Sequence, residues 1–199
     1  MPMITDIIIL AAGKGTRMQS ALPKVLHPLA GQPMLAHVIA AADSLTNAKK
    51  IIVTGHGAAQ VEEAMANTNS TFVQQTEQLG TAHAVQMAVP HLREEATVLI
   101  LYGDVPLITP ATIAKMLSAV SDSTIGLLTI DLDDPMGYGR ILRNSQGKIE
   151  SIIEQKDASP EQLKITEINT GVLAIGAREL MSWLPLINNN NAQGEYYLT

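Results

Sequence analysis

Short apolar runs alternate with helical patterns through the first two thirds of the chain. Runs rich in Ile, Leu and Val predict buried strands at Thr5–Leu10, Lys50–Thr54, Thr71–Gln74, Thr97–Tyr102 and Ile125–Leu132. Between them, apolar residues at helical spacing predict helices at Pro33–Leu45, Ala58–Ala66, Thr81–Pro90 and Pro110–Val120. This alternation is typical of an α/β fold, with a mostly parallel sheet flanked by helices.

The pattern changes after residue 132. Tyr138–Arg143 and Lys148–Ile153 read as two strands joined by a turn, and they are followed by a strand at Glu167–Ile175 and a helix at Ala177–Leu184. We therefore expect a small antiparallel region beside the main sheet. Because we find no repeat and no linker, we assign residues 1–199 to one domain. The final stretch looks like the start of a helix, which suggests a truncated end.

Composition narrows the function classes. The chain is 46% hydrophobic but only 3% aromatic, has a formal net charge of -6, and shows no basic stripe, so we expect no nucleic-acid partner. With no cysteine, disulfides, thiolate catalysis and cysteine-ligated zinc are excluded. The longest apolar runs fall far short of the roughly 20 residues that span a bilayer, and no signal peptide is visible. We predict a cytoplasmic protein without a membrane partner.

The stretch LAAGKGTRM at residues 10–18 follows the first predicted strand. Ligands of open α/β sheets lie at the carboxyl ends of strands, where bare backbone amides can hold phosphate oxygens. Arg17 and Lys24 add two positive charges to this loop. It is neither a P-loop, which needs Lys-Ser or Lys-Thr, nor a dinucleotide fingerprint, whose third glycine is replaced by Met18. An ordinary glycine turn is the alternative, and the two cations argue against it.

Asp104 follows a second predicted buried strand, in the sequence YGDVPLI. A carboxylate at such an end is well placed to hold Mg²⁺ beside phosphates. The alternative is an Asp that caps the turn or the helix after Pro110. We favour the metal, because the glycine loop is expected on the neighbouring strand. The histidines at 27, 37, 56, 83 and 91 lack ligand spacing, and we treat them as structural or solvated.

Further polar residues could read a base or a sugar. Gln75 offers a donor and an acceptor together, as a pyrimidine edge requires, and Gly80 lets backbone groups approach the base. A surface Gln followed by Thr81 as a helix cap remains the alternative. GYGRI at 137–141, Glu154 and NTGV at 169–172 supply neutral groups and one carboxylate for sugar hydroxyls, although Gly139 could be a simple turn glycine.

The motifs LAAGKGTRM, LPKVLHPLAG, QLGTAHA, YGDVPLI, DDPMGYGRI, EINTGV and NNNNAQGEYYLT run in order through the whole chain. Together they resemble the sugar nucleotidyltransferases, and in particular the bacterial bifunctional N-acetylglucosamine-1-phosphate uridyltransferases. The resemblance implies a Rossmann-like, GT-A-like nucleotidyltransferase fold. It also implies Mg²⁺-dependent formation of UDP-N-acetylglucosamine and pyrophosphate from UTP and N-acetylglucosamine 1-phosphate, a product that feeds peptidoglycan and lipopolysaccharide synthesis.

The resemblance also implies roles for individual residues. Arg17, Lys24 and Asp104 would be catalytic, with Arg17 and Lys24 on the triphosphate and Asp104 as the Mg²⁺ ligand. The amino sugar would contact Gly139, Glu154 and Asn169. The nucleotide would contact Leu10, Ala11, Ala12, Gly13, Lys24, Gln75, Gly80, Thr81, Tyr102, Gly103 and Asp104, with Gln75, Gly80 and Thr81 at the uracil.

Two features of the resembled family lie beyond this chain. One is a second metal-ligating Asn. The other is a C-terminal left-handed β-helix that acetylates glucosamine 1-phosphate and builds a homotrimer; no hexapeptide repeat is present here. We therefore expect these 199 residues to lack acetyltransferase activity and to show weak or absent uridyltransferase activity. Whether they assemble as a trimer is left open.

Two other functions remain open from the sequence. The first is another enzyme of the same fold, such as a glucose-1-phosphate uridylyl- or thymidylyltransferase or a cytidylyltransferase. The second is a non-catalytic nucleotide-binding module. The joint presence of Arg17, Lys24 and Asp104 argues against the second, because a decayed site would have lost at least one of them.

Overall fold

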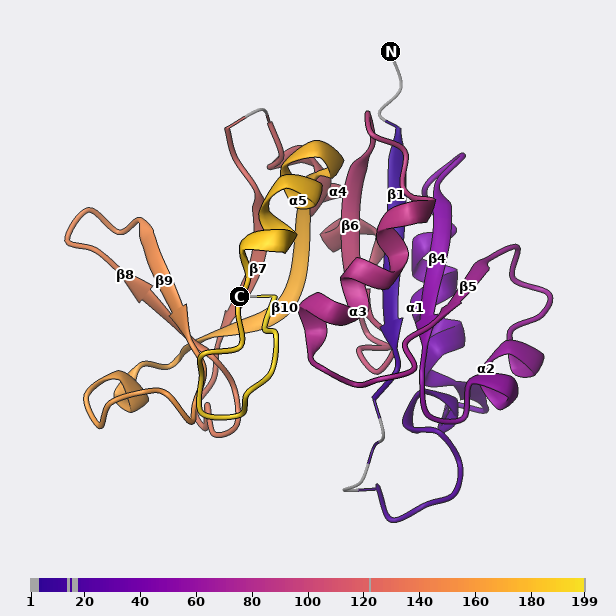
Figure 1. Cartoon of the computed structure of the whole chain (residues 1–199), viewed down its shortest axis with the longest axis horizontal. Helices are drawn as coiled ribbons and strands as arrows, with labels where there is room; N and C mark the ends of the chain where they lie inside the picture. The colour runs from indigo at the N-terminus through magenta and orange to yellow at the C-terminus, as the bar shows by residue number, and fades with distance from the viewer. Residues whose placement is uncertain (1–3, 14, 16–17, 122, 199) are drawn as a thin grey trace.

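A mixed β-sheet forms the centre of the molecule (Figure 1). The computed structural model describes residues 4–13, 15, 18–121 and 123–198, and these form an eight-stranded sheet in the order β5-β4-β1-β6-β10-β8-β9, with β7 also paired to β10. The first four strands run parallel, and β10 is antiparallel to β6, β7 and β8. The predicted α/β fold with a mixed, mostly parallel sheet is confirmed.

Most predicted elements are present with shifts of a few residues at their ends. The strands are β1 Thr5–Ala11, β4 Lys49–Thr54, β5 Thr71–Gln74, β6 Thr97–Tyr102, β7 Gly126–Asp131, β8 Arg140–Arg143, β9 Ile149–Ile153 and β10 Glu167–Gly176. The helices are α1 Met34–Ala42, α2 Ala58–Ala64, α3 Thr81–Ala88, α4 Pro110–Ser118 and α5 Ala177–Trp183. In the described residues, no helix is both long and apolar enough to cross a membrane.

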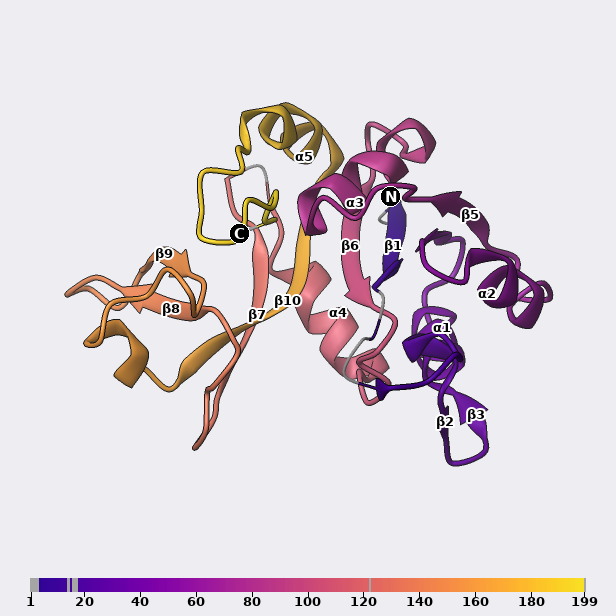
Figure 2. The same cartoon turned by 60° about the horizontal axis from the view of Figure 1, so that its bottom comes forward.

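Both faces of β1 are buried, which explains its nearly continuous run of Ile and Leu. Ile7 and Ile9 pack into one core cluster with residues of α1, α2 and α4. Ile8 and Leu10 face the opposite side, in a cluster with residues of α3 and α5. Figure 2 shows these helix layers above and below the sheet. The parallel part of the sheet is therefore covered by helices on both faces, and its side chains form the core.

The structure departs from the sequence prediction in several places, which include short 3-10 helices at Lys24–Leu26 and Gln162–Lys164. A small hairpin of β2 Pro28–Leu29 and β3 Gln32–Pro33 was not expected. The helix expected to start near the C-terminus is wrong, because residues 188–198 contain no helix. Instead, the Tyr196 amide donates to the Leu79 carbonyl at 2.8 Å, and the Ala82 amide donates to the Tyr196 carbonyl at 2.9 Å. These backbone bonds hold the last segment against the start of α3.

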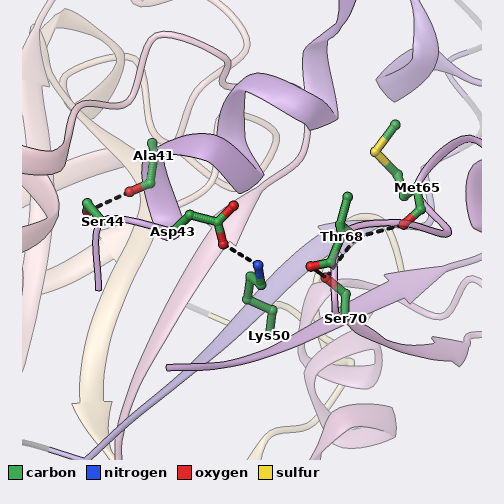
Figure 3. Close-up of polar contacts among 7 residues, drawn as sticks. All are labelled: Ala41, Asp43, Ser44, Lys50, Met65, Thr68 and Ser70. Carbon is green, nitrogen blue, oxygen red and sulfur yellow. Dashed lines mark hydrogen bonds and ion pairs between the residues drawn. The ribbon is translucent and has the colours of Figure 1, made fainter. Parts of the chain in front are cut away.

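Polar contacts also fix the connections that lead into β4 and β5 (Figure 3). Asp43, at the end of α1, forms an ion pair with Lys50 of β4. The Ser44 hydroxyl donates to the Ala41 carbonyl at 2.7 Å, and the Thr68 hydroxyl donates to the Met65 carbonyl at 2.7 Å. These short bonds satisfy carbonyls at the two helix ends, so the turns return the chain directly to the sheet.

A buried ion pair closes the amino end of the parallel strands. The Asp6 side chain is 0% exposed, and its Oδ1 accepts from Nε and Nη2 of Arg93 at 2.8 and 2.6 Å. The Arg93 amide donates to the other carboxylate oxygen at 2.7 Å, and Nη2 also donates to the Thr5 carbonyl at 2.7 Å. All these donors converge on one carboxylate, so its burial depends on Arg93.

We predict that Arg93→Ala destabilises the fold by about 3–5 kcal/mol, because it leaves the Asp6 carboxylate buried without its partner. Urea denaturation followed by circular dichroism would measure this loss. Lys164→Ala is the matched control: its pair with Glu161 has side chains that are 70% and 82% exposed, so its loss should lie below about 1 kcal/mol. Equal losses in the two variants would contradict the prediction.

Candidate functional site

The site begins where the order of the strands reverses. After β1 the chain adds β4 and β5 on one side, then crosses to place β6 on the other side of β1. Ligands of open α/β sheets bind outside the carboxyl ends of strands at such a switch point. Here the Gly103 amide, after β6, donates to the Leu10 carbonyl of β1 at 2.9 Å. The glycine loop and the YGD loop are thereby held side by side.

A cavity of about 240 Å³ opens at this switch point. Every predicted nucleotide-binding residue lines it except Gly103, together with four residues that sequence reasoning missed, Val25, Gln78, Ala84 and Glu195. Gly103 instead faces the core, where a Cβ would lie 3.1 Å from both Leu35 and Val25. Arg17 lies outside the described residues, so its predicted role is not tested.

One ion pair crosses the cavity lining. The Lys24 Nζ lies 2.5 Å from Asp104 Oδ2, and the two side chains are 39% and 28% exposed. Asp104 does not cap the following helix: that role belongs to Thr109, whose hydroxyl accepts from the Thr112 amide at 3.2 Å. The alternative interpretation of Asp104 as a cap of that helix is therefore wrong. Its carboxylate lines the cavity and is paired there with Lys24.

The donor set at Asp104 suits Mg²⁺ shared with a ligand. Magnesium prefers oxygen ligands, keeps several waters, and is usually held by one or two carboxylates together with substrate phosphates. Among the described residues no group of three His, Cys, Asp or Glu side chains could hold a metal by itself. Asp104 therefore fits a magnesium site that is completed by a phosphate of the ligand. The described residues do not form a site in which the protein alone supplies all the metal ligands.

Gln75 is held more tightly than the sequence suggested. It is only 3% exposed, and its backbone N–H donates to the Thr54 carbonyl at 2.7 Å. Its side-chain nitrogen lies 3.1 Å from the Gly80 carbonyl and 3.0 Å from His83 Nδ1. Both side-chain hydrogens are therefore used within the protein. The expectation that Gln75 offers donor and acceptor together is wrong, because only the acceptor remains for a ligand.

The C-terminal segment forms one wall of the cavity. Glu195 lines it, and the neighbouring Tyr196 backbone lies against Gly80 so closely that a Cβ on Gly80 would overlap its carbonyl. Gly80 also has a φ of +121°, which other residues rarely adopt. The Thr81 hydroxyl accepts from the Leu198 amide at 2.9 Å and caps no helix. These contacts link positions more than a hundred residues apart, beyond the reach of local sequence patterns.

The predicted sugar-binding residues also come together. The Asn169 amide of β10 donates to the Gly139 carbonyl at 2.9 Å. A Cβ on Gly139 would lie 2.8 Å from Glu154 Oε1, which places the carboxylate directly over this glycine. Asn169 Oδ1 accepts from the Gly171 amide at 2.9 Å. The three residues form one cluster at the junction of the main sheet with the β8–β9 hairpin.

Tyr102 connects this cluster to the cavity. Gly171 has a φ of +81°, and a Cβ there would lie 2.6 Å from the Tyr102 ring. The ring therefore packs against the bare backbone of Gly171, and Tyr102 also lines the cavity. Burial, followed by the nearby charges of Glu154 and Asp104, raises the pKa of Tyr102 to about 12. Its hydroxyl therefore stays protonated at neutral pH.

Comparison with known proteins agrees with this geometry. Residues 7–152 match the family model of the MobA-like NTP transferase domain. The chain belongs to this family. This chain is 59% identical over 194 residues to the bifunctional protein GlmU of Cellvibrio japonicus, and 58% identical over 194 residues to that of Saccharophagus degradans. Each match covers 98% of this chain but only 43% of the relative's length.

A solved structure shares the fold of this chain. UDP-glucose pyrophosphorylase complexed with UDP-glucose superposes with a TM-score of 0.74 at 17% identity, covering 99% of this chain and 84% of that one. At this identity the similarity establishes the fold alone. The predicted Rossmann-like nucleotidyltransferase fold is confirmed, and the specific reaction has to be argued from the site.

The raised pKa of Tyr102 predicts a pH dependence of stability. Since an unfolded tyrosine titrates near pH 10 and the folded one near 12, the folded state holds the proton more tightly. Its contribution to stability is complete below pH 10 and is lost as the pH rises from 10 to 12. We expect Tyr102→Phe to lose less stability than the parent across this range in urea denaturation. Tyr138→Phe, at an exposed position, should match the parent; identical slopes in all three proteins would refute the prediction.

Proposed function

We propose that this NTP transferase moves UMP from UTP to N-acetylglucosamine 1-phosphate and releases pyrophosphate. The observation that carries the proposal is the cavity at the switch point, which has bare backbone and the Lys24–Asp104 pair beside it and a buried Gln75 among its lining residues. The bare backbone and the Lys24–Asp104 pair suit a phosphate chain, and Gln75 suits a planar base. The high identity to relatives named as bifunctional GlmU supports the same substrates.

The reaction needs positioning more than covalent help. The phosphate oxygen of the sugar is already a nucleophile at neutral pH, attacks the α-phosphorus of UTP in line, and pyrophosphate leaves on the opposite side. Catalysis of such transfers rests on orientation and charge neutralisation. Lys24 would hold phosphate oxygens from the cavity wall, and the amides near Gly13 would contact others. Arg17 keeps its predicted role at the α-phosphate and leaving group.

Mg²⁺, when bound, would neutralise phosphate charge beside Asp104. The Lys24 ammonium lies 2.5 Å from this carboxylate and balances its charge. A ligand phosphate would compete with Asp104 for Lys24, so binding of the triphosphate would free the carboxylate for the metal. The triphosphate would thus replace Asp104 as the partner of Lys24, and Mg²⁺ would replace Lys24 as the partner of Asp104. This exchange explains how an acidic protein can hold a polyanion with few local cations.

The cluster of Gly139, Glu154 and Asn169 would hold the amino sugar. Tyr102 packs against Gly171, next to this cluster, and also lines the cavity, so its ring would lie between the sugar and the nucleotide. The absence of a Cβ at Gly139 leaves room for the Glu154 carboxylate. Sugar hydroxyls are good partners for such carboxylate and amide oxygens. We infer further that the chain corresponds to the uridyltransferase half of its bifunctional relatives, with acetyl transfer and trimer assembly assigned to the remainder of those proteins.

Isothermal titration calorimetry of the 199-residue chain tests the substrate assignment, because binding can survive where turnover does not. We expect heat with UDP-N-acetylglucosamine and with UTP in the presence of Mg²⁺, and at least tenfold weaker binding of UDP-glucose. Pyrophosphate release by the full-length protein, across pairs of nucleotides and sugar phosphates, gives the matching kinetic test. Clear heat with UDP-glucose and none with UDP-N-acetylglucosamine would replace our substrate with the alternative pairing.

We predict that Asp104→Asn lowers kcat of the full-length protein by about 10²–10³-fold, as expected for the loss of one preorganised charge. The variant should also lose the Mg²⁺-dependent gain in UTP affinity seen by calorimetry, while UTP binding without metal stays equal or tightens. Asp133→Asn removes the same charge from an exposed loop position and serves as the control. A near-normal kcat in Asp104→Asn would disprove the assigned role.

A further inference from the structure

His83 lies directly behind Gln75, on the first turn of α3. It is not among the residues that line the cavity, yet its Nδ1 is 3.0 Å from Gln75 Nε2. The Gly80 carbonyl lies 3.1 Å from the same nitrogen. Two groups of the protein therefore hold one end of the Gln75 amide. The sequence did not predict that either group would hold Gln75. On the sequence alone, His83 is structural or solvated, and Gly80 serves only to let backbone groups approach a base.

The Gly80 carbonyl decides which end of the amide it faces. A carbonyl can only accept a hydrogen bond, so it excludes the amide oxygen from this position and requires the nitrogen. With the nitrogen fixed there, its second hydrogen points at His83 Nδ1, which must then accept. An imidazole whose Nδ1 accepts carries its single proton on Nε2. The geometry thus sets the His83 tautomer as well as the Gln75 rotamer.

The remaining atom of the amide is Gln75 Oε1. Within the part of the chain that the structure describes, no donor occupies this oxygen, whereas both hydrogens on Nε2 are taken. Gln75 therefore presents the cavity with a fixed acceptor. A ligand group that meets it must bring a donor, and a lone pair placed there would leave a nearly buried oxygen unpaired, which is costly.

We propose that His83 is a positioning residue for base selection: with the Gly80 carbonyl it locks Gln75 so that Oε1 accepts from the N3–H of a uracil ring. Cytosine carries a lone pair at N3 and meets the same oxygen unfavourably. This inference rests on the proposed function, which puts the base of UTP against Gln75. Sites built around one hydrogen bond discriminate strongly against analogues that cannot make it.

Calorimetry with UTP and CTP tests the role of His83. The parent chain should bind UTP at least tenfold more tightly than CTP. In His83→Ala the amide loses one of its two anchors, and we expect the ratio of the two affinities to fall by about tenfold, the worth of one hydrogen bond. His83→Asn should keep most of the ratio, because Asn Oδ1 can accept in place of Nδ1. Gln86→Ala, on the same helix but outside the cavity lining, is the matched control.

Nitrogen-15 NMR of His83 in the ligand-free chain gives a second readout that needs no nucleotide. We expect the neutral form with the proton on Nε2, and side-chain NH₂ signals of Gln75 that shift in His83→Ala but little in Gln86→Ala. A proton on Nδ1, or an unchanged UTP to CTP ratio in His83→Ala, overturns the inference and leaves the proposed function standing. Equal binding of UTP and CTP by the parent, with the NMR pattern as expected, overturns the base assignment in the proposed function instead.

Discussion

The parallel pairing of β1 with β4 on one side and β6 on the other is the constraint on which the rest of the molecule depends. Leu10 is in register with Val53 and Tyr102, so the loops that follow these strands leave the sheet at one edge. Backbone bonds between strands are satisfied throughout this region, and apolar side chains fill both faces. The cavity at the switch point therefore opens at the carboxyl ends of these strands.

Charge is used locally in this protein. The chain is acidic overall, and an ion pair lies at each end of the parallel strands: Asp6 with Arg93 at one end, Asp104 with Lys24 at the other. The first pair is enclosed by several donors and has a structural role. The second pair lines the cavity, and among the described residues it is linked by one contact of 2.5 Å. Under the function that we propose, a phosphate group would compete for it, so that one kind of ion pair would serve stability at one end of the strands and binding at the other.

Hydrogen bonds inside the protein determine what the Gln75 end of the cavity can offer to a ligand. A buried Gln can make several hydrogen bonds, and those already made inside the protein determine what it offers to a ligand. The Gly80 carbonyl and His83 take the donors of Gln75, so its chemistry toward a base is narrower than that of a free amide. Gly80 contributes twice, because the lack of a side chain also admits the backbone of Tyr196.

The sequence by itself determined the elements and the loops that carry the site. The spacing of apolar residues and the local composition are properties of short stretches of sequence. They predicted nearly all strands and helices, the glycine loop, and the position of Asp104 at the end of a strand. Only the tertiary structure decided the partners: Lys24 with Asp104 across 80 residues, the C-terminal segment against α3, and Gly103 turned to the core. Hydrogen bonds and ion pairs depend on which atoms meet in space, and local patterns do not encode that meeting.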